Sequence, residues 1–224
     1  MTLNIPNPIN VKTVKNITEY HFLLDGPAGK IEALLTVPDS ENSYDAIGVV
    51  CHPHPLHGGS MSNKVAHTIA KTFIELGVPT IRFNFRGVDQ SEGKFDNGIG
   101  EQDDLLAVVN LMREYYPFES LWLGGFSFGS FVAFKTHKRA DATRLITVAP
   151  PVRMFNFDNL AQPTCPWLLV QGMADEVVSA EEILEWANKL STPPDIATLD
   201  EATHFFHGKL NDLKEVIIEH ITRS

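Results

Sequence analysis

The chain has 224 residues, of which 43% are hydrophobic and 21% are charged, a mixture typical of globular domains and unlike that of disordered or collagen-like chains. Its 18 Lys and Arg against 28 Asp and Glu give a net charge of −10, which would repel phosphate groups, so we expect neither nucleic acid nor an anionic membrane as a partner. No apolar run approaches the roughly 20 residues of a membrane span and no secretory signal is visible, so we expect a cytoplasmic protein with a single domain over residues 1–224.

The first part of the chain predicts a loose segment followed by a hairpin. Residues 1–16 begin with a Pro- and Asn-rich stretch and are expected to be loose. Two β-prone segments follow, residues 18–24 and 30–37, and the Gly- and Pro-containing residues 25–29 between them are typical of a turn. This pattern predicts an antiparallel β-hairpin, whose exposed surface is a candidate for forming a homodimer.

From residue 46 onward, short apolar runs alternate with segments of helical periodicity. The predicted strands are residues 46–51, 80–85, 121–124, 145–148, 167–171 and 196–199. The predicted helices are residues 63–76, 102–115, 128–137, 180–190 and 207–222. Apolar strands separated by helices indicate a parallel sheet that is covered on both faces. The sequence therefore predicts a three-layer α/β/α sandwich, mostly parallel, with its functional groups at the carboxyl ends of the strands.

A Gly-x-Ser-x-Gly pentapeptide, residues 125–129, lies between a predicted strand and a predicted helix. Small neighbours allow Ser127 to stand exposed on a sharp strand-to-helix turn, as an attacking nucleophile must. The free N–H of Phe128, at the start of the helix, would point toward an oxyanion that forms there. A glycine-bounded turn with a purely structural serine is the alternative interpretation.

A nucleophilic serine needs a histidine as its base and a carboxylate that orients the histidine. Asp175 lies in the loop after the strand predicted at 167–171, and His204 follows the last predicted strand. Together with Ser127 they would meet at one edge of the sheet. Their neighbours, Glu176 and His207, are rival candidates for the acid and the base.

These residues resemble those of the α/β-hydrolase fold family, in particular its small members without a cap that are related to dienelactone hydrolases and bacterial serine esterases. The resemblance runs from about residue 46 to the C-terminus, and its motifs are Cys51-His52-Pro53, Phe83-Asn84-Phe85-Arg86-Gly87, Gly125–Gly129, Gly172-x-x-Asp175 and Thr203-His204-Phe205-Phe206. It implies a serine hydrolase that needs no cofactor and cleaves a small carboxylic ester, with thioesters, lactones and peptides as alternatives.

The same resemblance implies a second oxyanion N–H in the loop after the strand at 46–51. Aligning His52 with the histidine of the family assigns this donor to His54, because Pro53 has no N–H. Two prolines stand in this loop where the family often has glycine, so Leu56 remains the second candidate.

Two other functions compete with the serine hydrolase. His52, His54 and His57 have the H-x-H-x-x-H spacing of a zinc-ligand cluster, which would make the protein a zinc hydrolase. Leu56, however, replaces the aspartate that such clusters usually carry between the last two ligands. The other alternative is a non-catalytic binding protein that keeps the fold.

Further side chains have structural interpretations. Cys51 and Cys165 cannot form a disulfide framework and are expected to be reduced core residues, with Cys51 a remote candidate for a nucleophile. Arg86 is expected either to pair with Asp103 or Asp104, bracing the loops of the site, or to be an ordinary surface charge.

The stretch between the strands at 145–148 and 167–171 is too short for a helical cap, so we expect an open cleft roofed by short loops, including residues 154–157. The phenylalanines expected near the site are Phe126, Phe128, Phe205 and Phe206, with Phe95 as a further candidate. Aromatic walls suit an apolar acyl chain or ring.

Overall fold

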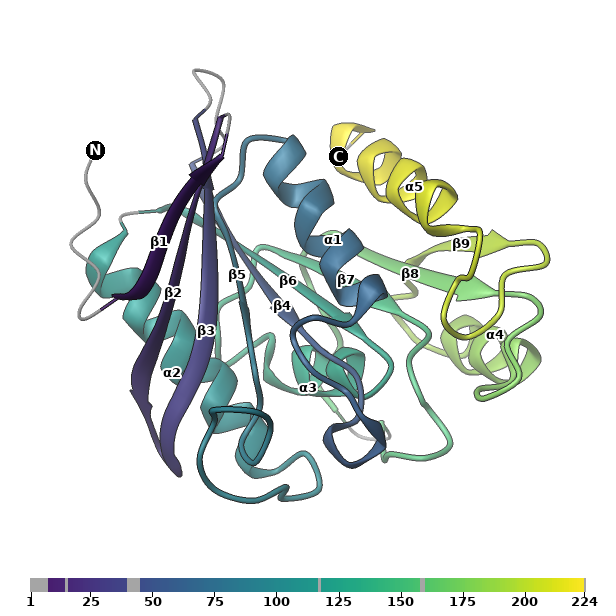
Figure 1. Ribbon diagram of the computed structural model, residues 1–224. Helices are drawn as coiled ribbons and strands as arrows, with labels where there is room; N and C mark the ends of the chain where they lie inside the picture. The colour runs from purple at the N-terminus through teal and green to yellow at the C-terminus, as the bar shows by residue number, and fades with distance from the viewer. Residues whose placement is uncertain (1–7, 15, 40–44, 117, 158–159, 224) are drawn as a thin grey trace.

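A nine-stranded sheet forms the centre of the computed structural model (Figure 1), which describes residues 8–14, 16–39, 45–116, 118–157 and 160–223. The strands are β1 Pro8–Val14, β2 Ile17–Gly26, β3 Gly29–Pro38, β4 Ala46–Cys51, β5 Thr80–Phe83, β6 Ser120–Phe126, β7 Arg144–Val148, β8 Trp167–Gly172 and β9 Asp195–Leu199. Their order in the sheet is β1-β2-β3-β5-β4-β6-β7-β8-β9. The first three strands are antiparallel, and β3 is also antiparallel to β5. From β5 to β9 the neighbouring strands are parallel, which confirms the predicted mostly parallel sheet.

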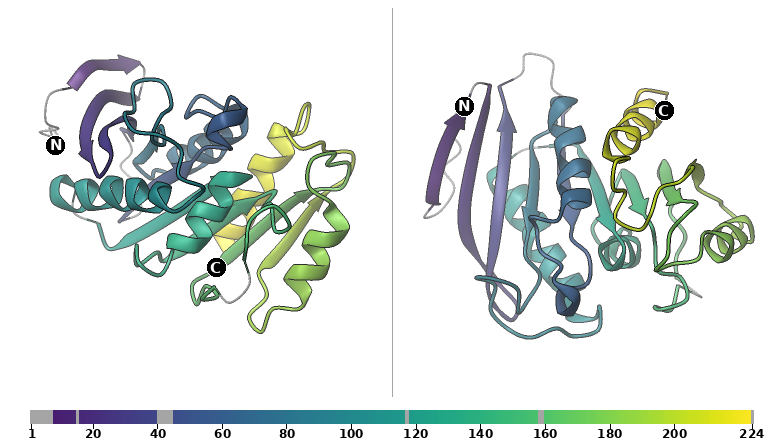
Figure 2. Two further views of the ribbon diagram at one scale, coloured as in Figure 1. Left: turned by 90° about the horizontal axis from the view of Figure 1, so that it is seen from below. Right: turned by 45° about the vertical axis from the view of Figure 1, so that its right-hand side comes forward.

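Helices cover both faces of this sheet (Figure 2). They are α1 Lys64–Glu75, α2 Gly100–Tyr115, α3 Phe128–Thr136, α4 Ala180–Asn188 and α5 Leu210–Arg223. On one face α1 packs beside α5, and on the other α2 packs beside α3. The apolar side chains divide into two buried clusters accordingly, because each amphipathic helix buries one apolar stripe against the strands. The predicted three-layer α/β/α sandwich is confirmed.

The N-terminal part of the chain differs from the sequence expectation. Residues 8–14 form β1, which pairs with β2 along the edge of the sheet, so the expectation of a loose segment is wrong there. The reason lies in the alternation of apolar and polar residues from Ile9 to Lys12, which is a strand pattern. Ile9 and Val11 remain about half exposed, because β1 lies at the edge of the sheet. The remaining residues of the segment, 1–7 and 15, lie outside the described residues, and Asn16 begins the next described range.

One smaller difference concerns the last helix, whereas the stretch between β7 and β8 agrees with the expectation. The last helix begins at Leu210 rather than at residue 207, because Phe206 and Gly208 have positive φ angles of 53° and 73° that interrupt a helix. Between β7 and β8 the described residues form turns and loops without a helix or strand, as expected for a protein without a cap. No helix of the described chain has the length and apolar character that crossing a membrane requires.

Candidate active site

Ser127 stands on a strained turn between β6 and α3. Its φ of 51° and ψ of −119° lie in a region that non-glycine residues rarely adopt, and its N–H donates to the carbonyl of Val148 at 2.8 Å. A Cβ at Gly125 would lie 2.3 Å from the Gly129 carbonyl oxygen, and one at Gly129 would lie 2.3 Å from the Cys51 carbonyl oxygen. Both glycines are therefore sterically required for this turn.

The two residues predicted to supply the oxyanion donors are neighbours at this turn through their side chains. Phe128 is the first residue of α3, so its N–H has no partner within the helix, and no acceptor for it occurs among the described residues. The absence of a side chain at Gly129 lets the end of β4 and the following loop pack against the start of α3. That loop carries His54, whose ring centroid lies 5.2 Å from that of Phe128.

The loop is held by His52, which is completely buried. Its Nε2 accepts the Phe85 N–H at 3.0 Å, so Nδ1 carries the proton and donates to the Pro53 carbonyl at 2.6 Å. Burial lowers the pKa of His52 to about 4, although the hydrogen bond to Pro53 opposes this. His52 is therefore neutral near pH 7, and both of its ring nitrogens are occupied.

The contacts of the His54 side chain distinguish between His54 and Leu56, the two candidates for the second oxyanion donor. Nδ1 of His54 accepts the N–H of Leu56 at 3.2 Å, at the start of a one-turn helix over Pro55–His57. The N–H of Leu56 is thereby occupied, whereas the N–H of His54 has no acceptor within the described part of the chain. This geometry favours His54 over Leu56 as an oxyanion donor.

Asp175 and His204 form a buried pair. His204 Nδ1 lies 2.8 Å from Asp175 Oδ2, and the Asp175 side chain is fully buried. Asp175 Oδ1 accepts the N–H groups of Val177 and Val178. Burial alone would raise the pKa of Asp175, but the hydrogen bonds from His204, Val178 and Val177 outweigh it and hold this pKa below its ordinary value. The carboxylate is therefore ionised at neutral pH and fixes the tautomer of His204 with the proton on Nδ1.

The rival acid and base take other roles. Glu176 Oε2 accepts the backbone N–H of His204 at 3.1 Å, so Glu176 supports the chain that carries the histidine and does not contact its ring. His207 is exposed and does not line the pocket described below. The ring of His204 packs on Phe126, with ring centroids 4.9 Å apart.

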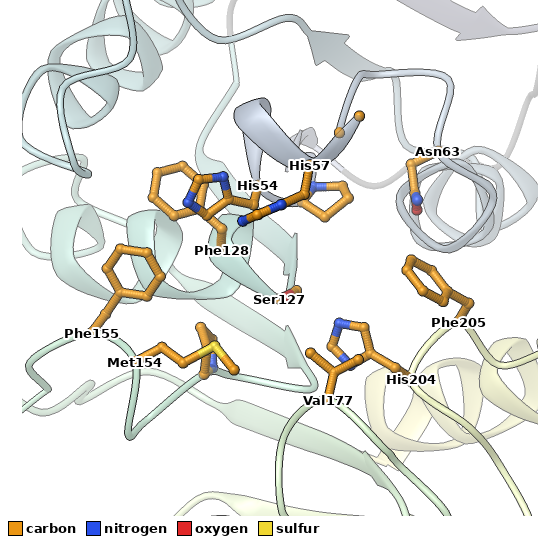
Figure 3. Close-up of a pocket in the computed structure, with 14 residues that line it drawn as sticks. His54, His57, Asn63, Ser127, Phe128, Met154, Phe155, Val177, His204 and Phe205 are labelled. Atoms are coloured by element: carbon orange, nitrogen blue, oxygen red, sulfur yellow. The ribbon is translucent and has the colours of Figure 1, made fainter.

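Ser127 and His204 line one pocket of about 470 Å³ at the carboxyl ends of the strands (Figure 3). Its walls come from four loops and the start of α3, and include His54, His57, Asn63, Phe128, Pro151, Met154, Phe155, Val177 and Phe205. No Asp, Glu, Lys or Arg is among the described residues that line it. The lining is therefore mainly apolar, and its polar side chains are those of Ser127, Asn63 and three histidines.

The predicted phenylalanines divide between the pocket and its support. Phe128 and Phe205 line the pocket, and Phe155 joins them from the loop after β7. Phe126 and Phe206 are fully buried behind it. Phe95 packs on His54, with ring centroids 4.7 Å apart, and does not line the pocket itself.

The three histidines do not form the zinc cluster of the alternative interpretation. His54 and His57 are neighbours, with ring centroids 4.5 Å apart, but both nitrogens of His52 are engaged by backbone groups. Among the described residues, no group of three or more His, Cys, Asp or Glu side chains is arranged to hold a metal ion. The zinc interpretation therefore lacks one of its three ligands.

The predicted brace is present, with Asp104 as the partner of Arg86. The guanidinium contacts the carboxylate through two hydrogen bonds and also donates to the Gly100 carbonyl. Asp103 instead pairs with Arg139 on the surface. Cys51 is buried, and burial raises the pKa of its thiol far above its ordinary value, which excludes a thiolate nucleophile there.

One pocket residue, Asn63, was missed by the sequence analysis. It caps the N-terminus of α1, where its Oδ1 accepts the N–H groups of Val65 and Ala66. The sequence shows an asparagine at the start of a predicted helix. This pattern indicates a helix cap and does not indicate that the side chain lines a pocket.

Comparisons with known proteins agree with this architecture. A family model described as an alpha/beta hydrolase domain matches residues 47–217. The chain is similar to a Xanthomonas campestris protein described as a serine hydrolase without lid, with a TM-score of 0.89 and 36% identity over 98% of this chain and 97% of that one. It is also similar to an alpha-beta serine hydrolase homologue from Coxiella burnetii, with a TM-score of 0.85 and 44% identity over 89% of this chain and 95% of that one. An uncharacterized protein of Rickettsia prowazekii is 34% identical over 207 residues, which cover 88% of this chain and 86% of that protein.

Proposed function

This chain belongs to the alpha/beta hydrolase family, and from that premise we propose that it is a serine hydrolase that cleaves carboxylic esters. The observation that carries the proposal is the buried hydrogen bond of 2.8 Å between His204 and Asp175, at a pocket that Ser127 also lines. The relatives described as serine hydrolases support the same reaction class.

In the first half of the reaction, Ser127 Oγ attacks the ester carbonyl carbon while His204 Nε2 takes its proton. Asp175 stabilises the imidazolium that results, because its carboxylate remains ionised. The negative charge that forms on the carbonyl oxygen is stabilised by the N–H groups of Phe128 and His54, which have no acceptor within the described residues. The intermediate then collapses, the C–O bond breaks, and His204 returns the proton to the departing alcohol.

In the second half, water replaces the alcohol. His204 takes a proton from water as the water oxygen attacks the acyl group on Ser127, and it gives the proton back to Ser127 Oγ when the acid leaves. The cycle consumes one water and releases one alcohol and one carboxylic acid. An uncharged ester is favoured over a charged substrate because no Asp, Glu, Lys or Arg is among the described residues that line the pocket.

A fluorophosphonate probe tests the proposal directly, since it phosphonylates only an activated serine. We expect the wild type to be labelled at Ser127, to hydrolyse short p-nitrophenyl esters, and to lose both properties in Ser127→Ala. Ser179→Ala is the matched control, because Ser179 only caps α4 and lies outside this pocket.

Two outcomes would support the competing functions. Equal ester hydrolysis by the wild type and Ser127→Ala would reject Ser127 as the nucleophile, and loss of that activity with EDTA would favour a zinc hydrolase. Absence of both labelling and hydrolysis in the folded wild type would favour a non-catalytic binding protein.

A further inference from the structure

The orientation of the Asn63 amide is fixed by the helix that it caps. Its side-chain acceptor lies 2.9 Å from the N–H of Val65 and 3.2 Å from that of Ala66. Because both partners are donors, the atom that faces them must be the carbonyl oxygen Oδ1, and the amide nitrogen Nδ2 must face away from the helix. These bonds also occupy the N–H groups at the start of α1, so the helix end itself has no free donor at these two residues.

The amide nitrogen of Asn63 is free to bind a ligand. Asn63 lines the same pocket as Ser127 and His204, and within the described part of the chain no acceptor pairs with its Nδ2. In Figure 3 the side chain of Asn63 lies on the same side of Ser127 as Phe205, opposite Met154 and Phe155. Asn63 therefore brings two N–H donors, unpaired within the described residues, to the lining of the pocket.

The chemistry of the proposed reaction assigns this side to the alcohol part of the ester. The group that protonates the departing alcohol must lie next to it, and that group is His204. The ring of Phe205 lies 5.2 Å from that of His204, on the side where Asn63 is found. The oxyanion donors and the wall formed by Phe128, Met154 and Phe155 lie on the other side of Ser127, where the acyl group would fit.

We propose that Asn63 Nδ2 donates a hydrogen bond to an oxygen in the alcohol part of the substrate. The inference rests on the proposed ester hydrolysis and adds a substrate class to it. That class is an uncharged ester that joins an apolar acid to an alcohol with a second oxygen, as a hydroxyl or an ether, near the scissile bond. An unpaired donor at the pocket selects for such an oxygen. A bound hydrocarbon alcohol would displace water from the amide and leave it without a hydrogen-bond partner.

The test uses two esters of nearly identical shape, the n-butyl and 2-methoxyethyl esters of the acid whose p-nitrophenyl ester the enzyme hydrolyses best. They differ by one CH₂ that is replaced with oxygen. The ratio of their kcat/KM values is divided by the ratio of their hydroxide-catalysed rates, which removes their difference in intrinsic reactivity. We expect the wild type to prefer the 2-methoxyethyl ester by about threefold to tenfold after this correction.

Asn63→Ser and Asn63→Asp are the informative variants. Serine and aspartate both accept hydrogen bonds from a helix N-terminus, so the cap of α1 is retained, while neither side chain can supply the two amide donors. Both variants are expected to lose the preference for the 2-methoxyethyl ester. Ser179→Ala, which loses the cap of α4 outside this pocket, is expected to keep it.

The outcomes separate this inference from the proposed function. A corrected ratio that is the same in the wild type, Asn63→Ser and Asn63→Asp would overturn the role of Asn63 and leave the esterase proposal intact. Hydrolysis of the p-nitrophenyl ester with turnover of neither alkyl ester would also overturn the assignment of the alcohol side. A wild type that hydrolyses none of the three esters and whose Ser127 is not labelled would overturn the proposed function itself.

Discussion

The guanidinium of Arg86 holds the carboxylate of Asp104 in a paired contact, with Nε–Oδ2 and Nη2–Oδ1 distances of 2.9 Å and 2.7 Å. The carboxylate is fully buried and also accepts the backbone N–H of Arg86. This contact joins the loop after β5 to the second turn of α2. It therefore fixes the segment that carries Phe95, whose ring supports His54.

Asp104→Asn should destabilise the protein by about 3 kcal/mol, because it leaves a largely buried guanidinium without its counter-charge. The neighbouring substitution Asp103→Asn is a matched control. It breaks a half-exposed pair with Arg139 and should change the stability by less than about 1 kcal/mol. Urea unfolding at neutral pH measures the unfolding free energy of both variants. Equal losses in Asp104→Asn and Asp103→Asn would show that the buried pair stabilises the protein no more than the half-exposed one.

Gly129→Ala should separate the two oxyanion donors. Its Cβ would lie 2.3 Å from the Cys51 carbonyl oxygen, so α3 and the end of β4 must move apart. Overpacking of this kind costs about 1–3 kcal/mol, and a displacement near 1 Å lowers the rate of ester hydrolysis by about 100-fold. Gly208→Ala is the comparison, since no atom lies within 4 Å of its added Cβ and only its φ of 73° is unfavourable. It should keep the activity of the wild type in the same p-nitrophenyl ester assay.

The buried His52 makes the stability depend on pH. Its pKa of about 4 in the folded protein lies below the ordinary value of 6.5, so between these values the unfolded chain binds a proton that the folded chain does not. Stability is therefore lost as the pH falls from about 6.5 to about 4, by about 3 kcal/mol in total. His52→Gln should flatten the slope of unfolding free energy against pH in this window.

Substitution of the exposed His207 by Gln is the control for His52→Gln, and it should leave that slope unchanged. The lowered pKa of Asp175 acts in a separate window. The stability that Asp175 contributes to the folded protein is present above the ordinary pKa of 3.8 and is lost only at lower pH. If His52→Gln kept the wild-type slope of unfolding free energy against pH, other titratable groups would be responsible for the loss of stability in acid.

The sequence predicted those parts of the site that depend on local sterics and on chain order. The Gly125 requirement comes from close contacts with Gly129 and Ser130, within five residues along the chain, and the sequence pattern shows it directly. Gly129 was predicted from the same pentapeptide, although its close contact is with Cys51 of β4. Asp175 and His204 were predicted because each follows a strand of a parallel sheet, and the carboxyl ends of parallel strands share one edge. The structure places both next to that edge and in contact with each other.

The parts that the sequence left open or missed depend on contacts between distant segments. Nothing local distinguishes a histidine that lines a pocket from His52, whose Nε2 is occupied by Phe85 from another strand end. Likewise, an asparagine that caps a helix has the same sequence pattern whether or not its amide faces a cavity, as at Asn63. The edge strand β1 was missed because the Pro- and Asn-rich residues at its start indicated a loose segment, although the residues that follow alternate as in a strand.

Asp175→Asn should lower kcat by about 10⁴, through the tautomer of His204 and not through the fold. The N–H groups of Val177 and Val178 both point at Oδ1 and would bind the carbonyl oxygen of the new amide. The amide NH₂ would then occupy the Oδ2 position and face His204 Nδ1 and Gln171 Nε2, both of which donate to Oδ2 in the wild type. His204 Nδ1 must become an acceptor, and the Gln171 side chain must turn its amide oxygen toward the new NH₂. The proton would move to Nε2, and that nitrogen could no longer take the proton of Ser127.

Glu176→Gln provides the matched control for Asp175→Asn. Its amide oxygen can still accept the backbone N–H of His204, so the ring keeps its position and tautomer, and the loss of activity should be tenfold or less. The measurement is the steady-state hydrolysis of a p-nitrophenyl ester, together with thermal unfolding to verify that both variants fold. If Asp175→Asn kept more than a tenth of the wild-type kcat, the carboxylate would not be the group that orients His204. A larger loss in Glu176→Gln than in Asp175→Asn would instead assign that role to Glu176.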